Sequence, residues 1–277
     1  MGYALALASA ALYGAADFLG GFASRRAGTV AIVVVSQAAG LVLLAALLPF
    51  MPAAPFHSDL WWGGASGLAG GIGVALLYRA LAVGPMAVAA PTTAVCAVLI
   101  PVVADLLGGQ RFGLQTTIGI VLALVAIVLV SRADSARTGH VSAGLLLALA
   151  SGVAIGFFFL ALARTRPEAG MWPLVSARAV SVSLFVLIAL VGRAPLRMPA
   201  DVARIAIAGG VVDMAANALY LLATRRGVLS VVVTLSSLYP ASTVVLARVV
   251  MGERLTGWQG VGMAAALAAV ALIVAGP

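Results

Sequence analysis

Four ionisable side chains lie inside otherwise apolar stretches of this sequence: Asp17, Arg79, Arg178 and Asp213. In hydrocarbon, such a charge costs roughly 2.5 to 3.5 kcal/mol on insertion scales. Charges persist in such places when they pair with one another, bind a solute or carry protons. The four residues are therefore candidates for a binding site, and the elements that carry them must give each one a partner or a water-filled space.

Asp213 begins a polar stripe on a small-residue segment, AGGVVDMAANALY (208–220). Asn217 follows one helical turn later and Tyr220 three residues beyond it, so the three side chains share one helical face. The glycines and alanines around them make a thin helix that a neighbouring helix or a ligand can approach closely. Two interpretations stay open: a hydrogen-bonded packing cluster, or the polar wall of a cavity.

Pairing of opposite charges is geometrically open at two places. Arg178 and Asp213 lie on successive stretches that run in opposite directions, and their depths differ by only about 5 Å at 1.5 Å per residue. A guanidinium group spans that difference. Asp17 and Arg79 are open to a pair by the same reasoning. In both cases the alternatives are a structural ion pair and contact with a solute.

Three more residues complete the candidate substrate-binding set: Tyr78, Thr234 and Tyr239. Thr234 and Tyr239 stand close to Pro240, and a proline inside a helix frees backbone carbonyl groups and bends the helix. We expect such a bent helix to expose polar groups to a cavity. Threonine can also bond to its own helix, so the packing alternative remains.

The composition places all these residues in a membrane protein. Hydrophobic residues make up 64% of the chain, charged residues make up 9%, and the mean hydropathy is +1.18. Soluble domains carry about 25% charged residues, so this chain cannot cover itself with a polar surface. The net charge of +8 comes from arginines that stand singly or in pairs between apolar blocks. That distribution is typical of topology signals, and we expect no nucleic-acid partner.

Other chemistries lack the residues that they need. Cys96 is the single cysteine and lies in an apolar run, so neither a disulfide framework nor a cysteine metal cluster is expected. His57 and His140 have no acid or second histidine at ligand spacing. We therefore expect no catalytic residues, no metal and no cofactor, and we do not expect an enzyme.

Apolar blocks of about 20 residues, the length that crosses a bilayer, predict an all-α integral membrane protein with ten transmembrane helices. The expected spans are 2–24, 30–50, 60–83, 86–107, 113–131, 141–163, 171–192, 201–223, 228–250 and 257–276. Their connections are short, so no soluble domain fits between them.

The sequence repeats itself at an offset of 142 to 143 residues. The aligned pairs include Ser9 with Ser151, Gly14 with Gly156, Tyr78 with Tyr220, and GGQRF (108–112) with MGERL (251–255). We divide the chain into a first five-helix repeat at 1–133, a linker at 134–140 and a second repeat at 141–277. An odd number of spans inverts the second repeat relative to the first. Inverted repeats are typical of alternating-access transporters, whose site lies near the midplane between the halves.

The segments YRALAVGPMAVAAPTTAV (78–95) and MGERLTGWQGVG (251–262) resemble the ten-span, EamA-type branch of the drug/metabolite transporter superfamily. The resemblance implies a secondary-active transporter, since members export amino acids, other metabolites and drugs. Eukaryotic relatives carry sugar phosphates or nucleotide sugars. Gln110 stands where the family often has glutamate, which leaves the role of this loop acid open. We interpret Glu253 as a helix-end charge near Arg254.

The first span, in SAALYGAADFLGGFASRRAG (9–28), is also similar to the first helix of small multidrug resistance proteins. The shared features are a lone acid, Gly20 and a charged pair before the turn. In those proteins the acid binds protons and cationic substrates in competition. Asp17 replaces their usual glutamate, and Phe159 occupies its aligned position in the second repeat, so the chain has one such acid. A structural pair with Arg79 is the alternative.

These observations favour a secondary-active transporter that exports a small polar or amphipathic metabolite, amino-acid-like or cationic, with protons as the candidate coupling ion. The expected setting is a multi-pass monomer in the bacterial cytoplasmic (inner) membrane, with the lipid bilayer and a small-molecule substrate as partners. The positive-inside rule places both termini outside, whereas many family members are drawn with termini inside. The alternatives are a lipid-type flippase, a non-transporting receptor or scaffold, and a lipid-modifying enzyme.

Overall fold

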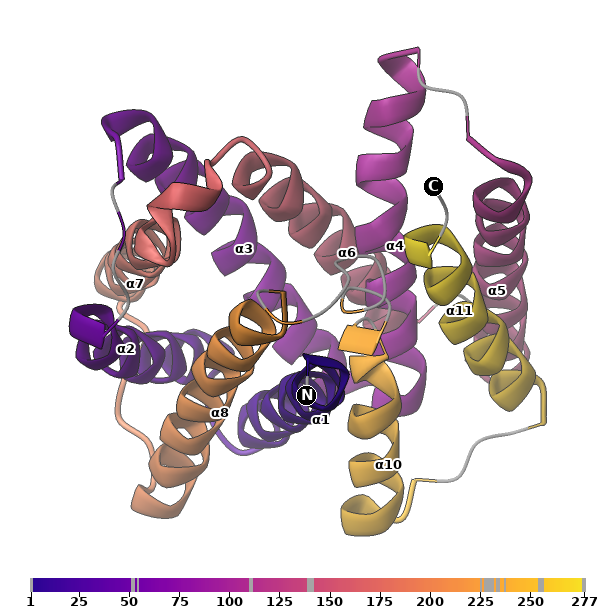
Figure 1. Ribbon diagram of the computed structural model, residues 1–277. Helices are drawn as coiled ribbons and strands as arrows, with labels where there is room; N and C mark the ends of the chain where they lie inside the picture. Colours follow the sequence, from indigo (N-terminus) through magenta and orange to yellow (C-terminus); the bar gives the residue numbers. More distant parts are fainter. Residues whose placement is uncertain are drawn as a thin grey trace.

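The computed structural model describes residues 2–50, 53, 55–109, 112–138, 142–224, 226, 232, 235, 236, 238–253 and 257–275. The regular structure of these residues is helical (Figure 1). The helices are α1 (Gly2–Ser24), α2 (Thr29–Leu47), α3 (His57–Val83), α4 (Met86–Leu107), α5 (Leu114–Thr138), α6 (Ala143–Leu162), α7 (Trp172–Val191), α8 (Ala200–Thr224), α10 (Tyr239–Met251) and α11 (Gly257–Ala275), with short 3-10 turns η1 (Leu48–Phe50) and η2 (Pro167–Ala169).

The helices follow the predicted spans closely, because each apolar block ends at glycine, proline or charged residues. Eight of the described helices are long and apolar enough to cross a membrane. Two boundaries differ from the prediction. α5 continues to Thr138, so residues 134–138 of the expected linker are helical. The expected span 228–250 contains α10 from Tyr239, and most of its earlier residues lie outside the described part.

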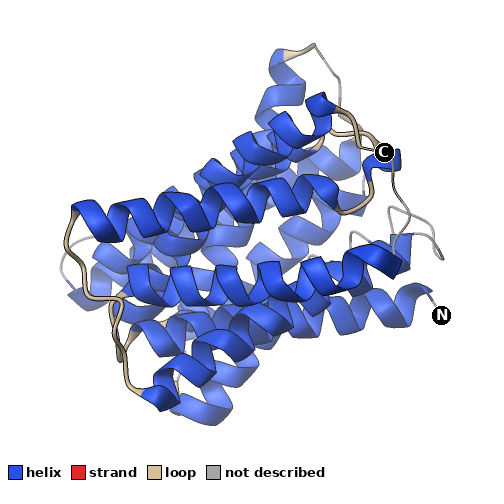
Figure 2. Cartoon of the chain, turned by 90° about the vertical axis from the view of Figure 1, so that its left-hand side faces the viewer, coloured by secondary structure: helices blue, strands red, loops and turns tan. Residues whose placement is uncertain are grey.

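Successive helices run in alternating directions, so α1 begins and α11 ends at the same end of the bundle (Figure 2). We call this end, where α3 and α7 also begin, the N-terminal face. At the opposite face α1 and α3 end and α4 and α6 begin. These two faces define the depth at which each side chain lies.

Packing between the two predicted repeats is reciprocal. α1 packs against α8 as α6 packs against α3, α2 against α8 as α7 against α3, and α1 against α10 as α6 against α4. α5 with α11, α2 with α7, and α4 with α10 complete the set. Some contacts break the reciprocity. α4 packs against α11, whereas their counterparts α10 and α5 do not pack together to a comparable extent in the described residues. α1 packs against α3, whereas their counterparts α6 and α8 do not pack together to a comparable extent in the described residues.

Two aligned serines illustrate the reciprocal packing. Ser9 Oγ in α1 donates to the carbonyl oxygen of Ala216 in α8 at 2.9 Å. Ser151 Oγ in α6 donates to the carbonyl oxygen of Gly73 in α3 at 2.7 Å. Both serines are fully buried. A hydroxyl group that reaches a neighbouring helix satisfies itself within the apolar interior and fixes the depth of the two helices against each other.

Glycines bring helix backbones into direct contact at the crossings. A Cβ atom added to Gly67 of α3 would lie 2.3 Å from the carbonyl oxygen of Ala177 in α7. One added to Gly210 of α8 would lie 1.9 Å from the carbonyl oxygen of Ser36 in α2. The obstructing atoms belong to the backbone, so they cannot turn aside. Small residues at helix crossings are the expected means of association in a bilayer.

Gly210→Ala is therefore expected to lower the free energy of unfolding by about 2 kcal/mol, the scale of overpacking in a close-packed interior. Thermal unfolding of the purified protein in detergent measures the change. Gly260→Ala in α11 is the matched control, because an added Cβ there meets no atom within 4 Å. Equal melting temperatures for the two variants would contradict the steric account.

Candidate functional site

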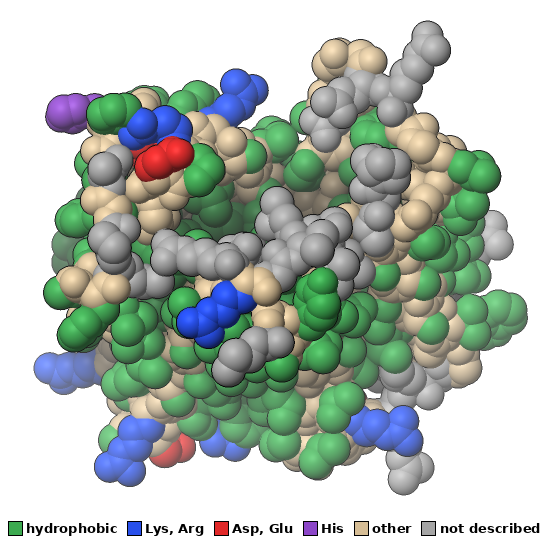
Figure 3. Space-filling model, viewed as in Figure 1, with side chains coloured by type: hydrophobic (Ala, Val, Ile, Leu, Met, Phe, Trp, Pro, Cys, Tyr) green, Lys and Arg blue, Asp and Glu red, His purple; other side chains and the backbone are tan. Residues whose placement is uncertain are grey.

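A cavity of about 650 Å³ lies between the two halves of the chain. We call it the central cavity. Its walls come from α1, α2, α3, α6, α7, α8, the η2 turn and the start of α10. Lining residues lie on α6 from Ile155 onward, on α7 up to Ser181 and on α8 from Asp213 onward. The cavity therefore extends from the middle of the helices toward the N-terminal face, which is hollowed in Figure 3.

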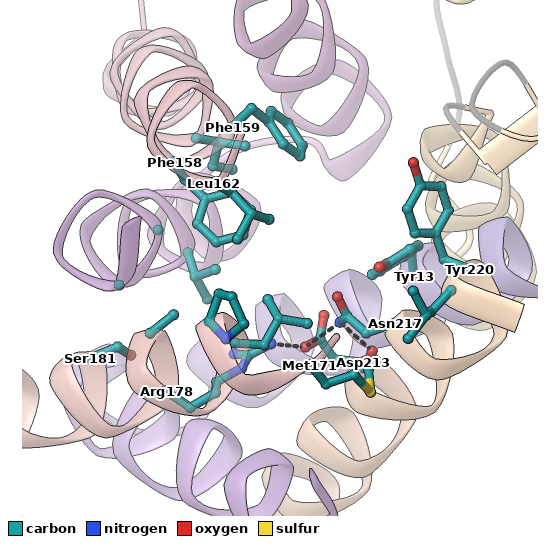
Figure 4. A pocket seen from close by; sticks show the side chains of 18 of the residues that line it. Tyr13, Phe158, Phe159, Leu162, Met171, Arg178, Ser181, Asp213, Asn217 and Tyr220 are labelled. Atoms are coloured by element: carbon teal, nitrogen blue, oxygen red, sulfur yellow. Dashed lines mark hydrogen bonds and ion pairs between the residues drawn. The ribbon is translucent and has the colours of Figure 1, made fainter. Parts of the chain in front are cut away.

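The floor of the central cavity is a polar cluster around Arg178. Its Nη2 pairs with Oδ2 of Asp213, and its Nη1 donates to Oε1 of Gln37 (Figure 4). Asn217 Nδ2 donates to the backbone oxygen of Asp213 at 2.8 Å and lies 3.5 Å from its Oδ2. The predicted Arg178–Asp213 neighbourhood is confirmed. Three helices, α2, α7 and α8, supply the cluster, so it is a tertiary contact at mid-depth.

Gln37 and Tyr13 are cavity residues that sequence reasoning missed. Gln37 is the one amide within the apolar run TVAIVVVSQAAGLVLLAAL of α2, and its side chain is buried. Tyr13 lies one turn before Asp17 on α1 and also lines the cavity. The criterion that selected Asp17, a polar group inside an apolar span, would have selected both.

Asp17 lines the central cavity on α1. Within the described residues it has no ion pair, so the alternative of a structural pair with Arg79 does not hold. The reason is rotation of α3. Tyr78 turns toward α1, where a Cβ on Gly20 would lie 2.1 Å from its ring, and the next residue points about 100° away. Arg79 is accordingly exposed, and it does not line the cavity.

The remaining predicted site residues divide into three groups. Tyr220 and Tyr239 line the cavity. Tyr78 is buried between α1 and α3 and is absent from the cavity walls, which corrects its placement. Thr234 lies outside the described residues. The ring of Tyr239 meets that of Tyr13 edge to face, with centroids 6.3 Å apart.

The wall opposite the polar cluster is apolar. Phe158, Phe159 and Leu162 of α6 face the space above Arg178 (Figure 4), and Val74 and Leu77 of α3 extend the wall. Aligned positions of the two repeats carry different residue types in this cavity, since Phe159 is the aligned counterpart of Asp17. A framework with reciprocal packing therefore encloses a cavity with one polar side and one apolar side.

Arg166 stands at the mouth of the cavity near the N-terminal face. Its Nη2 lies 2.7 Å from Oδ2 of Asp59, and its backbone N donates to Oδ1 at 3.0 Å. Asp59, at the start of α3, is 1% exposed, and the guanidinium also lies over the ring of Phe56 at 3.5 Å. These contacts hold the end of α6 against the start of α3. Within the described residues, no group of His, Cys, Asp and Glu could hold a metal ion.

Arg178→Ala is expected to destabilise the fold by about 2 kcal/mol, because it leaves Asp213 and Gln37 without their shared donor. This lies below the 3 to 5 kcal/mol typical of fully buried pairs, since the two side chains are 16% and 25% exposed. Combining Arg178→Gln with Asp213→Asn removes both charges and should recover more than half of the loss in detergent unfolding measurements. A double variant no more stable than Arg178→Ala would exclude a stabilising pair.

Comparison with known proteins gives a consistent classification. The model of the EamA-like transporter family matches the chain twice, over residues 1–132 and 142–275. A solved structure described only as "Crystal structure of protein" matches with a TM-score of 0.58 and 22% sequence identity, over 95% of this chain and 96% of that chain. At this identity the likeness shows the fold alone. No curated protein matches the chain significantly. The two family matches, on apolar helices long enough to cross a bilayer, show that this chain is a multi-pass membrane protein of the EamA-like transporter family.

Proposed function

We propose that this chain is a secondary-active exporter of a small amphipathic solute that carries a cationic group, an amino-acid-like compound being one example. The family assigns membrane transport, and the substrate class and coupling are proposals. The observation that carries them is Asp17, an acid in the central cavity with no ionic partner among the described residues. The neighbouring acid, Asp213, is already paired with Arg178.

The charge balance of the cavity supports a cation. Arg178 neutralises Asp213 and Arg166 neutralises Asp59, which leaves Asp17 as the acid available to a solute. Tyr13 and the other cavity tyrosines surround it with aromatic faces, which attract ammonium groups. A solute carboxylate could meet the guanidinium of Arg178 at the floor.

The size and the apolar wall support a solute with a hydrophobic body. A volume of about 650 Å³ falls within the range of small-molecule pockets. Phe158, Phe159 and Leu162 offer that body an apolar surface opposite the polar cluster. A non-transporting receptor or scaffold would not require a cavity of this kind between its two halves.

Proton coupling follows from the position of Asp17. A carboxyl group inside a span can bind a proton as well as a cation, and acids at such positions form proton relays in transporters. Binding of a proton and binding of a cationic solute would then compete for one carboxylate. That competition lets the solute move one way as protons move the other.

We further propose that ten spans form two inverted repeats that exchange roles during transport. The reciprocal helix pairs support this arrangement, since the contacts of α1 with α8, α2 with α8 and α1 with α10 each recur with the halves exchanged. One exception, α1 against α3, lies at the opposite face and is what a state closed there requires. Because most arginines lie toward the opposite face, the positive-inside rule makes it cytoplasmic and turns the cavity outward. A bacterial inner membrane and a monomeric transporter fit this orientation.

Asp17→Asn is expected to abolish transport driven by a pH gradient while the protein stays folded, because the change removes a titratable group and breaks no ion pair between described residues. The measurement is uptake of radiolabelled amino acids and small organic amines into proteoliposomes, with and without a pH gradient. Asp201→Asn is the control, because this acid is exposed and its ion pair with Arg26 is long, at 3.9 Å. Full gradient-driven transport by a stable Asp17→Asn protein would exclude the coupling role.

A further inference from the structure

At the opposite face, Arg25 binds the end of α3 and an acid from the other half of the chain. Its Nε and Nη2 donate to the carbonyl oxygen of Leu81 at 3.1 and 3.0 Å, and Nη2 also donates to that of Gly84 at 3.0 Å. The same Nη2 pairs with Oε1 of Glu253 at 3.1 Å. A guanidinium at the last carbonyl groups of a helix complements the negative end of the helix dipole.

Glu253 binds the start of α4. Its Oε1 accepts from the backbone N of Met86 at 3.2 Å, and its Oε2 accepts from that of Ala87 at 3.3 Å. The first N–H groups of a helix need a partner, and the residue before α4, Pro85, provides no side-chain cap. The acid that α4 lacks locally therefore comes from 166 residues further along the chain. Glu253 follows the end of α10, as the helix-end interpretation expected, and its neighbour Arg254 lies outside the described residues.

The cluster closes the end of the passage that the central cavity does not reach. On α3 the cavity extends to Leu77, and the next turn carries Leu81, which is fully buried. A Cβ on Gly21 of α1 would lie 2.5 Å from Cβ of Leu81 and 3.2 Å from Cε of Met86. No space remains between α1 and the α3–α4 turn. Arg25 and Glu253 lie over this packed layer.

We infer that Arg25 and Glu253 form a latch that holds the opposite face closed, and that the latch must break for the central cavity to open there. This inference rests on the proposed transport function. The side chains of Arg25 and Glu253 are 29% and 16% exposed. Water can therefore replace each partner when the latch opens, which keeps opening accessible. A fully buried pair would hold the face shut.

The latch also gives the two repeats different roles. The aligned counterpart of Glu253 in the first repeat is Gln110, which carries no charge and lies outside the described residues. A neutral amide makes weaker hydrogen bonds to helix N–H groups than a carboxylate does. The acid therefore biases the molecule toward the state closed at the opposite face and open at the N-terminal face.

Cysteine accessibility tests the latch in purified protein. Both reporters are single cysteines introduced into a Cys96→Ala background. The first is Ala87→Cys, because Ala87 is 3% exposed and its backbone N donates to Glu253. The other is Thr165→Cys, in the wall of the cavity. Glu253→Gln should raise the rate of labelling at position 87 by a hydrophilic maleimide about tenfold, the scale expected for loss of a charge-assisted contact. The same change should lower labelling at position 165, because opening one face closes the other.

Two further variants, one of the latch and one control, decide the outcome. Arg25→Gln removes the other partner of the latch and should reproduce both shifts. Arg26→Gln removes an exposed pair with Asp201 at 3.9 Å and a contact with the ring of Phe22, and it should change neither rate. Unchanged labelling at position 87 in folded Glu253→Gln and Arg25→Gln proteins would overturn the latch. So would a rise at 87 with no fall at 165, which indicates local fraying, or a rise at both positions, which indicates unfolding. Accessibility needs no substrate, so these results stand apart from the transport measurements.

Discussion

A charge inside the bilayer must find a partner or water, and the contact of Arg178 with Asp213 and Gln37 meets that requirement for two charges at once. The arrangement of the central cavity depends on it. The cluster joins α7, α8 and α2 at mid-depth and neutralises the acid of α8. As a result Asp17, on α1, is the cavity acid without an ion pair among the described residues.

The framework treats its two halves alike, and the chemistry does not. Reciprocal helix pairs and the aligned bonds of Ser9 and Ser151 give both halves much of the same packing. Asp17 lines the central cavity, and the residue aligned with it in the second repeat is Phe159. Glu253 is likewise aligned with an uncharged residue, Gln110. In the proposed function, the reciprocal packing supports two alternating states. The asymmetry of charge then sets which face the Arg25–Glu253 latch holds closed and where a cation binds.

Much of the architecture could be predicted because a bilayer constrains a chain strongly. Helix positions follow from apolar length, and the Arg178–Asp213 contact follows from depth, since depth along a helix is proportional to residue number. Residue number does not show how a helix is rotated about its own axis relative to its neighbours. For that reason the depth argument also allowed a pair between Asp17 and Arg79, which the packing of Tyr78 against Gly20 turns apart.

The sequence by itself determined that this is a helical membrane protein, where most of its helices run, and that Asp17, Arg178 and Asp213 are rare polar residues inside them. Composition and periodicity suffice for these features because they are local. Only the tertiary structure decided that Gln37 completes the cluster, that α6 supplies an apolar wall, and that Glu253 caps α4 and pairs with Arg25. Each of these joins helices far apart in the chain, and the rotation and crossing of packed helices depend on all their neighbours at once.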